Sequence, residues 1–308
     1  MKKLIFVAAV VLALALITVG LTAANGGPHG GYTPTTDACA GCHRAHTAQA
    51  PHLLVSSSTQ DLCLSCHGST GTGADTNVTD GFFLSTRGPS TEGTANTVDS
   101  APLLGGGFVN YKGAAVTSTH DVGGSNTAAW GNGVNRGVTG ALSAGLDCAS
   151  CHNPHGSTNY RILEATINSV AVVVAQVDES AKDYDTEHWG AGQGQVCTAC
   201  HSAYHKTAAG QGSILDNGTY THRVDMPYNY GGNVNPETVG MGGLTLPLSA
   251  ETGTDDTVVC QTCHLPHGTS AQMTGYAAGA GLPGSTSATD SALLRLDNRA
   301  VCEVCHQK

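Results

Sequence analysis

Hydrophobic and polar residues follow no sustained period along most of this chain, and the clearest apolar stretch lies at its start. An apolar run from Leu4 to Val19 follows two lysines and precedes small residues that end at Ala24. A basic start, an apolar run and a small-residue end predict a signal peptide at residues 1–24, cleaved after Ala24. The alternative is an uncleaved membrane anchor, for which the run is short and has no positively charged flank behind it.

One later stretch has a clear β pattern. Residues 167–177, INSVAVVVAQV, are dense in β-branched side chains and free of Gly and Pro, which predicts one arm of a hairpin or small sheet without chemistry of its own. The longest insertion, residues 68–147, is instead rich in Gly, Ser, Thr and Asn, with Phe82, Phe83 and Phe108 as its apolar anchors. The pattern therefore favours loops over regular elements.

All twelve cysteines belong to six CxxCH motifs. Two thiols at this spacing can add across the two vinyl groups of one haem, and the histidine that follows can coordinate its iron. Structural zinc, a thioredoxin-like centre or a disulfide framework would not require that histidine. The motifs therefore predict six covalently bound haem c groups, attached by Cys39, Cys42 and His43; Cys63, Cys66 and His67; Cys148, Cys151 and His152; Cys197, Cys200 and His201; Cys260, Cys263 and His264; and Cys302, Cys305 and His306.

Three motifs, the first, third and fifth, extend to CxxCHxxH, and we call them the doubled motifs. In the third, His155 follows His152 by three residues, a tether of at most about 10 Å when extended. So short a tether cannot carry its imidazole around the porphyrin edge to the opposite face of the same iron, so His155 is expected to ligate a different haem. A proline precedes the second histidine in the third and fifth motifs and stiffens the turn.

Nine histidines lie outside the motifs, and six are needed if every iron has two histidine ligands. The six expected distal ligands are His46, His120, His155, His205, His222 and His267. For His29, His52 and His188 a surface role is favoured, and Met226, Met241 and Met273 are read as packing residues. With both faces of each iron closed, outer-sphere electron transfer is favoured over catalysis, and no CxxCK variant marks a reductase haem. The protein is therefore predicted not to be an enzyme and to have no catalytic residues.

Composition bears on the fold and the partners. Forty-one glycines, against two Trp, nine Tyr and four Phe, leave too few large apolar side chains for a conventional core. The haems would supply that core, within a single domain of residues 25–308 made mostly of loops with short helices and few strands. Residues 290–306 are expected to be short helical pieces that carry Leu293, Leu294, Leu296 and Val301 toward a haem. Without the signal segment, 23 acidic residues face 11 basic ones, which argues against a nucleic-acid partner.

The ordered series CHRAH, CLSCH, STHD, CHNPHG, CHSAYH, THR, CHLPHG and VCEVCHQK resembles the doubled-CxxCH multihaem c-type cytochromes, specifically the hexahaem outer-surface cytochromes of the OmcS type that form extracellular nanowires. The resemblance implies a continuous stack of parallel and T-shaped haem pairs with scant secondary structure. It also implies a homopolymer in which His46 ligates a haem of the adjacent subunit.

Together these features predict an exported protein that conducts electrons along stacked haems and does not catalyse a reaction on a substrate. The expected form is an extracellular filament at the outer cell surface that passes electrons to other redox proteins and to an external acceptor. Two alternatives stay open: a monomeric periplasmic shuttle, and a multihaem reductase with one open haem.

Overall fold

The computed structural model describes residues 29, 36–71, 74–84, 102–130, 138–175, 189–190, 192–204, 222–228, 244–250, 257–279 and 290–306. The expected signal peptide at residues 1–24 lies outside the described residues, as do His188 and His205. Within the described part of the chain, no helix has both the length and the apolar character needed to span a membrane.

The helices are short, and the motifs lie on them or at their ends. In each motif the first cysteine starts or continues a helical turn that places the second cysteine three residues further on, on the same side. The backbone N–H of His43 donates to the carbonyl oxygen of Cys39 at 2.8 Å, and the later motifs repeat this bond. The helices are η1 (Thr36–Gly41), η2 (Pro51–Leu53), α2 (Thr59–His67), η3 (Cys148–Ser150), η4 (Tyr160–Ile162), α3 (Gln193–Thr198), η5 (Ser202–Tyr204), α4 (Cys260–Cys263), α5 (Gly275–Gly279), η7 (Asp297–Arg299) and α6 (Ala300–Cys305).

The strands are two to four residues long and form small separate sheets. Among the described residues, the largest sheet has four strands in the order β10-β12-β13-β11, and the other sheets are two-stranded. The strands are β1 (Thr76–Asn77), β2 (Phe82–Phe83), β3 (Asn110–Tyr111), β4 (Ala114–Ala115), β5 (Ser118–Thr119), β6 (Ala128–Trp130), β7 (Val138–Ala141), β8 (Thr166–Ile167), β9 (Val170–Ala171), β10 (Trp189–Gly190), β11 (Met226–Pro227), β12 (Ser249–Ala250), β13 (Thr257–Val258) and β14 (Gly268–Thr269). The expectation of a chain made mostly of loops, with short elements, is confirmed.

The β-rich stretch at residues 167–177 differs from the single arm that its composition predicts. It folds back on itself, because β8 pairs antiparallel with β9 across a two-residue turn. Asn168 and Ser169 occupy that turn with φ of 46° and 64°, the backbone combination that lets a two-residue turn follow the twist of its strands. Beyond it, Val172 and Val174 are buried against Tyr160 in one of the core clusters.

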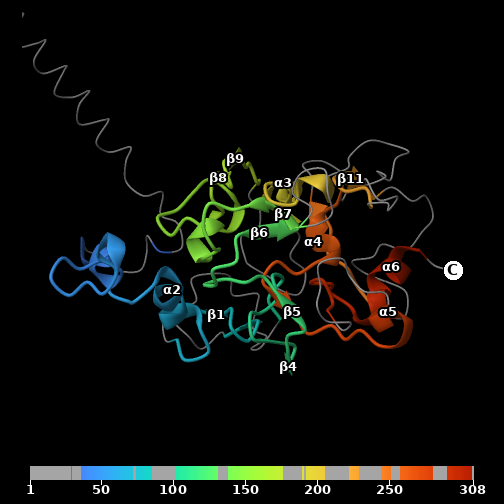
Figure 1. Ribbon diagram of the computed structural model, residues 1–308, viewed down its shortest axis with the longest axis horizontal. Helices are drawn as coiled ribbons and strands as arrows, with labels where there is room; N and C mark the ends of the chain where they lie inside the picture. Colours follow the sequence, from blue (N-terminus) through green and yellow to red (C-terminus); the bar gives the residue numbers. More distant parts are fainter. Residues whose placement is uncertain are drawn as a thin grey trace, which may run out of the picture.

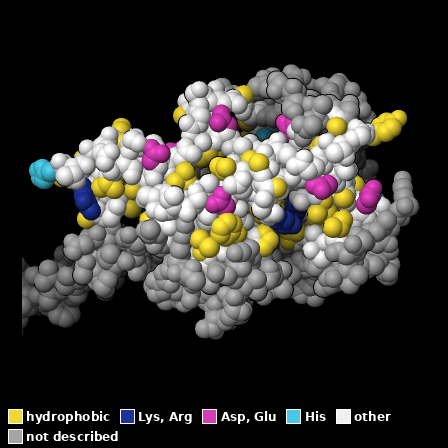
Figure 2. All heavy atoms as spheres, turned by 90° about the horizontal axis from the view of Figure 1, so that it is seen from below, with side chains coloured by type: hydrophobic (Ala, Val, Ile, Leu, Met, Phe, Trp, Pro, Cys, Tyr) yellow, Lys and Arg dark blue, Asp and Glu magenta, His cyan; other side chains and the backbone are white. Residues whose placement is uncertain are grey.

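Among the described residues, buried apolar side chains form three small clusters. The largest contains Tyr160, Leu163, Ile167, Val172, Val174 and Ala199, a second contains Phe83 and Leu103, and a third contains Leu246, Val301 and Val304. Leu294 and Leu296 pack at the margin of the third cluster, which does not include Leu293. Their expected orientation toward a haem stays a prediction. On the face shown in Figure 2, further hydrophobic side chains are scattered among polar ones.

The chain is laid out along the long axis of the molecule. The lobe that carries the first motif, drawn in blue, lies at one end, whereas α5 and α6 with the sixth motif, drawn in red, lie at the other (Figure 1). The third and fourth motifs lie between these ends. The first and last motifs therefore stand at opposite ends of the molecule.

Candidate haem-binding sites

Each doubled motif is held by a short later segment that we call its return segment. The return segments of the first, third and fifth motifs are residues 52–55, 161–164 and 292–295. In the first copy, the N–H of Arg44 donates to the carbonyl oxygen of Leu53 at 2.8 Å, and the N–H of Val55 donates to that of Cys42 at 3.0 Å. The equivalent bonds recur for the third and fifth motifs, and isolated β-bridges pair His43 with Leu54, His152 with Leu163 and His264 with Leu294. One local structure is therefore built three times.

The return segment also orients the ring of the motif histidine. Nδ1 of His43 bonds to the carbonyl oxygen of His52 at 2.7 Å, Nδ1 of His152 to that of Arg161 at 3.0 Å, and Nδ1 of His264 to that of Ala292 at 2.8 Å. A carbonyl oxygen only accepts, so Nδ1 carries the proton and Nε2 presents a free lone pair. This is the arrangement by which metal-ligating histidines are commonly held.

Pairs of histidine rings from distant parts of the chain face each other at similar distances. With metal–nitrogen bonds of about 2 Å, two imidazoles on opposite sides of one ion place their ring centres roughly 6 Å apart. Among the described residues, five pairs of histidine ring centres have this separation: His43 and His155 at 6.0 Å, His29 and His67 at 6.0 Å, His120 and His201 at 6.3 Å, His152 and His267 at 6.3 Å, and His222 and His306 at 6.2 Å. Each pair joins one CxxCH histidine to one other histidine.

The doubled motifs share one pairing rule. The histidine of the first CxxCH faces His155, the second histidine of the third motif. That of the third CxxCH faces His267, the second histidine of the fifth motif. Neither second histidine faces the CxxCH histidine of its own motif, in keeping with the short tether between them.

The second, fourth and sixth motifs follow a different rule. The CxxCH histidine of each faces a loop histidine that lies earlier in the chain. His67 faces His29, His201 faces His120, and His306 faces His222. Two of these histidines are held by doubled motifs, because Nδ1 of His29 bonds to the carbonyl oxygen of Pro154 at 3.0 Å and Nδ1 of His120 bonds to that of Pro266. Nδ1 of His222 bonds instead to the carbonyl oxygen of the adjacent Arg223 at 2.6 Å. For His29 the sequence had favoured a surface role, and its position opposite His67 makes it a candidate ligand.

His264 and His46 remain outside these pairs. Among the described residues, no second histidine ring faces His264, although its Nδ1 is held in the same way as in the other copies. His46 is exposed at the end of the molecule that carries the first motif. His205, expected as a distal ligand, lies outside the described residues, and His52 is exposed on the first return segment.

Burial keeps several of the facing imidazoles neutral. It lowers the pKa of His120 and His152, each of which also donates to a backbone carbonyl. Burial lowers the pKa of His264, which lies outside the pairs, in the same way. Burial, followed by the neighbouring His152, lowers the pKa of His267 to about 3. A neutral imidazole retains the lone pair that a metal needs, so these rings are suited to ligation at neutral pH.

Cysteines of consecutive motifs lie next to each other in space. A hydrogen bond to Cys148, followed by burial, raises the pKa of the Cys63 thiol, and the same bond lowers that of Cys148. Cys197 and Cys260 form an equivalent pair. Electrostatic contacts connect Cys42 to Cys66, Cys151 to Cys200, and Cys263 to Cys302. The six motifs therefore follow one another in space in chain order.

The donor set fits haem. None of the twelve cysteines forms a disulfide, so each motif retains two thiols, and each pair of rings contributes two imidazoles. Among the described residues, no group of three or more His, Cys, Asp or Glu side chains is arranged to hold a metal ion. A haem iron takes four ligands from its porphyrin and requires only the two imidazoles, which is what each pair supplies.

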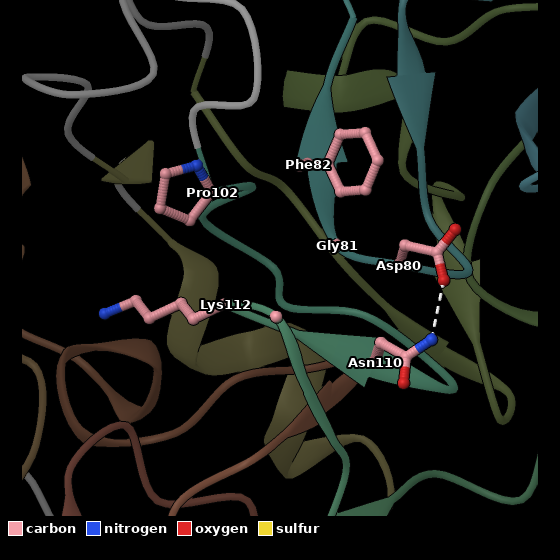
Figure 3. Close-up of a pocket in the computed structure, with 7 residues that line it drawn as sticks. Asp80, Gly81, Phe82, Pro102, Asn110 and Lys112 are labelled. Atoms are coloured by element: carbon pink, nitrogen blue, oxygen red, sulfur yellow. Dashed lines mark hydrogen bonds between the residues drawn. The ribbon is translucent and has the colours of Figure 1, made fainter.

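A separate hollow lies away from the motifs. It has a volume of about 480 Å³ and is lined by Asp80, Gly81, Phe82, Pro102, Asn110, Lys112 and Gly113 (Figure 3). The carboxylate of Asp80 accepts hydrogen bonds from the side-chain amides of Asn77 and Asn110, each at 2.8 Å. No CxxCH residue lines this hollow, and its carboxylate is already engaged in holding the hairpin that forms the wall.

Comparison with known proteins agrees with the motif reading. Residues 33–72 and 140–170 match the family model described as "Doubled CXXCH motif". These two segments carry the doubled CXXCH motif. The matched segments contain the first three motifs. The fourth, fifth and sixth motifs are identified by their CxxCH sequences alone.

Two solved filament structures from Geobacter sulfurreducens are similar to this chain. An outer membrane cytochrome S filament is 17% identical, with 88% of this chain and 98% of that chain covered and a TM-score of 0.46. The OmcS nanowires determined by cryo-EM are 18% identical, with 88% and 93% covered and a TM-score of 0.44. No curated protein matches the chain.

The attachment residues stay a prediction from the sequence, and the ring pairs differ in part from the expected distal ligands. The pairs contain His120, His155, His222 and His267 from the expected distal ligands, together with His29, which was not among them. The return segments were also missed. A signal for them exists, because HLLV at residues 52–55 and RILE at residues 161–164 begin the same nine residues after their motif histidines.

Proposed function

We propose that this chain is an exported hexahaem c-type cytochrome that carries electrons along a line of bis-histidine haems and assembles end to end into an extracellular filament. The observation that carries the proposal is the pairing of CxxCH histidines with distant histidines at ring separations near 6 Å. Haem supplies one-electron exchange at its iron when bound. The chain would supply the thiols that attach the haems, the axial nitrogens and the spacing between neighbouring haems.

Each CxxCH would attach one haem through its two cysteines and ligate it through its histidine. The distal ligands would be His155, His29, His267, His120 and His222 for the first, second, third, fourth and sixth motifs. Because both faces of these irons would be closed, no substrate could bind to them, which supports electron transfer over catalysis. The order of neighbouring cysteines supports a single route from the first motif to the sixth.

The pairing rule of the doubled motifs supports assembly. The first motif takes its partner from the third, and the third takes its partner from the fifth. By the same rule, His264 of the fifth motif would take its partner from the next doubled motif. In an end-to-end assembly, that motif would be the first motif of a second copy, and its second histidine is His46. His46 is exposed, and the first and sixth motifs lie at opposite ends of the molecule. His46 would therefore complete the fifth haem site of the next subunit.

Two measurements test the proposal. Mass spectrometry of the mature protein should find six covalently attached haems, and fewer would contradict the attachment residues. Electron microscopy of the purified protein should show filaments, and His46→Ala should abolish them without changing the haem content. His52→Asn is the matched control, because His52 lies in the same lobe at a left-handed φ of 61°, which asparagine tolerates. Filaments that form normally from His46→Ala would reject the intersubunit ligand in favour of a histidine of the same chain, such as His205.

A further inference from the structure

The three return segments are alike in backbone but differ in charge at their last position. The N–H of Val55 donates to the carbonyl oxygen of Cys42 at 3.0 Å, that of Glu164 to Cys151 at 2.8 Å, and that of Arg295 to Cys263 at 2.9 Å. Each of these three side chains is half-buried. One backbone position beside the second cysteine of a doubled motif therefore carries a neutral, an acidic and a basic residue in turn.

Arg295 is firmly held beside the fifth motif. Its Nε donates to the carbonyl oxygen of Gln261, inside the motif, at 2.7 Å, and its Nη2 donates to that of Leu104 at 2.9 Å. Burial lowers the pKa of Arg295 to about 10, so the guanidinium remains positively charged at neutral pH. Its charge acts on the motif, because it contributes to the lowered pKa of His264.

Glu164 occupies the equivalent place beside the third motif. Its Oε2 accepts a hydrogen bond at 3.4 Å from the side-chain amide of Asn153, the residue that follows His152 in the sequence. Its charge acts to raise the pKa of His152, whereas the charge of Arg161 acts to lower it. The guanidinium of Arg161 lies over the ring of Tyr160, 5.1 Å from its centre. The third site therefore feels both charges, and the effect of Glu164 has to be measured by removing Glu164 alone.

Reduction of a haem adds one electron without making or breaking a bond to the protein. A fixed positive charge nearby favours that added electron, and a fixed negative charge opposes it, most strongly where water is excluded. We propose that the last position of the return segment sets the relative reduction potentials of the three doubled-motif haems: Arg295 raises the fifth, Glu164 lowers the third, and Val55 leaves the first unshifted. This inference rests on the proposed haems. It names the residues that would make the reduction potential differ from one haem to the next.

A potentiometric titration of the purified holoprotein, followed by absorbance, tests the inference. Arg295→Gln should move one of the six one-electron steps to lower potential, and Glu164→Gln should move one step to higher potential. Val55→Thr is the matched control, since it changes the same position without a change in charge and should leave the titration unchanged. A structural disturbance has no reason to act with opposite sign at the two sites.

Further variants separate charge from packing. Arg295→Lys loses the forked hydrogen bonds but keeps the charge, so its titration should stay near that of the native protein. If Arg295→Gln does not take up haem, Arg295→Met fills the space with a flexible apolar chain and repeats the measurement. Titrations that superimpose on the native curve in variants with six haems would overturn the inference, as would equal shifts for lysine and glutamine or shifts of one sign at both sites. A native protein without haem would instead overturn the proposed function.

Discussion

The rings of His43 and His155 lie 6.0 Å apart, centre to centre, and only 20° from parallel. They belong to different doubled motifs, and the first of them is fixed by a bond from its Nδ1 to the carbonyl oxygen of His52. This separation leaves room for one metal ion between the two rings. The following predictions derive from this relationship and from its repeats.

Removal of His155 should open one iron. We expect His155→Ala to retain six haems, because the cysteines are untouched, and to convert the haem of the first motif from low spin to high spin. Electron paramagnetic resonance and the absorbance change on adding carbon monoxide would measure this. A fully low-spin spectrum, with no response to carbon monoxide, would contradict the pairing of His155 with His43.

His29 and His52 give a matched comparison within the N-terminal region. His29 faces the ring of His67, whereas His52 contributes its carbonyl oxygen to His43 and has an exposed side chain. We therefore expect His29→Ala to open one haem to carbon monoxide and His52→Asn to open none. If neither variant responds to carbon monoxide, His29 is not an axial ligand and has the surface role that the sequence favoured.

Loss of covalent haem should unfold the chain. Within the described part of the chain, the buried apolar clusters contain only six, two and three residues. Ordering the backbone costs about 1–2 kcal/mol per residue, so we expect burial of the haem faces to supply much of the apolar contact that offsets this cost. Protein made without haem attachment should therefore be cleaved rapidly by proteases and show little ordered secondary structure by circular dichroism. Protease resistance equal to that of the holoprotein would show that the peptide has a sufficient core of its own.

Gly106 should be intolerant of a side chain. Its φ is +83°, and an added Cβ would clash with the carbonyl oxygen of Gly268, in the strand that follows His267. Gly113 has a similar φ of +80°, but nothing lies within 4 Å of its added Cβ. Both alanine variants carry the cost of a left-handed backbone, about 1–2 kcal/mol.

Because only Gly106→Ala adds the clash, its melting temperature should fall further than that of Gly113→Ala, with a disturbed spectrum for the haem at His267. Thermal unfolding followed by haem absorbance gives both values. Equal melting temperatures would mean that the loop moves aside at no cost.

The sequence alone predicts the attachment chemistry. Spacing within CxxCH is local, since two cysteines three residues apart lie on one side of a helical turn whatever the rest of the chain does. The short tether between His152 and His155 likewise limits their reach, and the abundance of glycine with few aromatic residues predicts a loop-rich fold with short elements.

Only the tertiary structure decided which histidine faces which. Nothing near His29 in the sequence distinguishes it from a solvated residue, and its place opposite His67 depends on a hydrogen bond to Pro154 far along the chain. The charge series of Val55, Glu164 and Arg295 was equally hidden, because the third return segment follows its motif histidine after 28 residues instead of nine. Covalent attachment is set by neighbours in the chain, whereas axial pairing and local charge are set by neighbours in space.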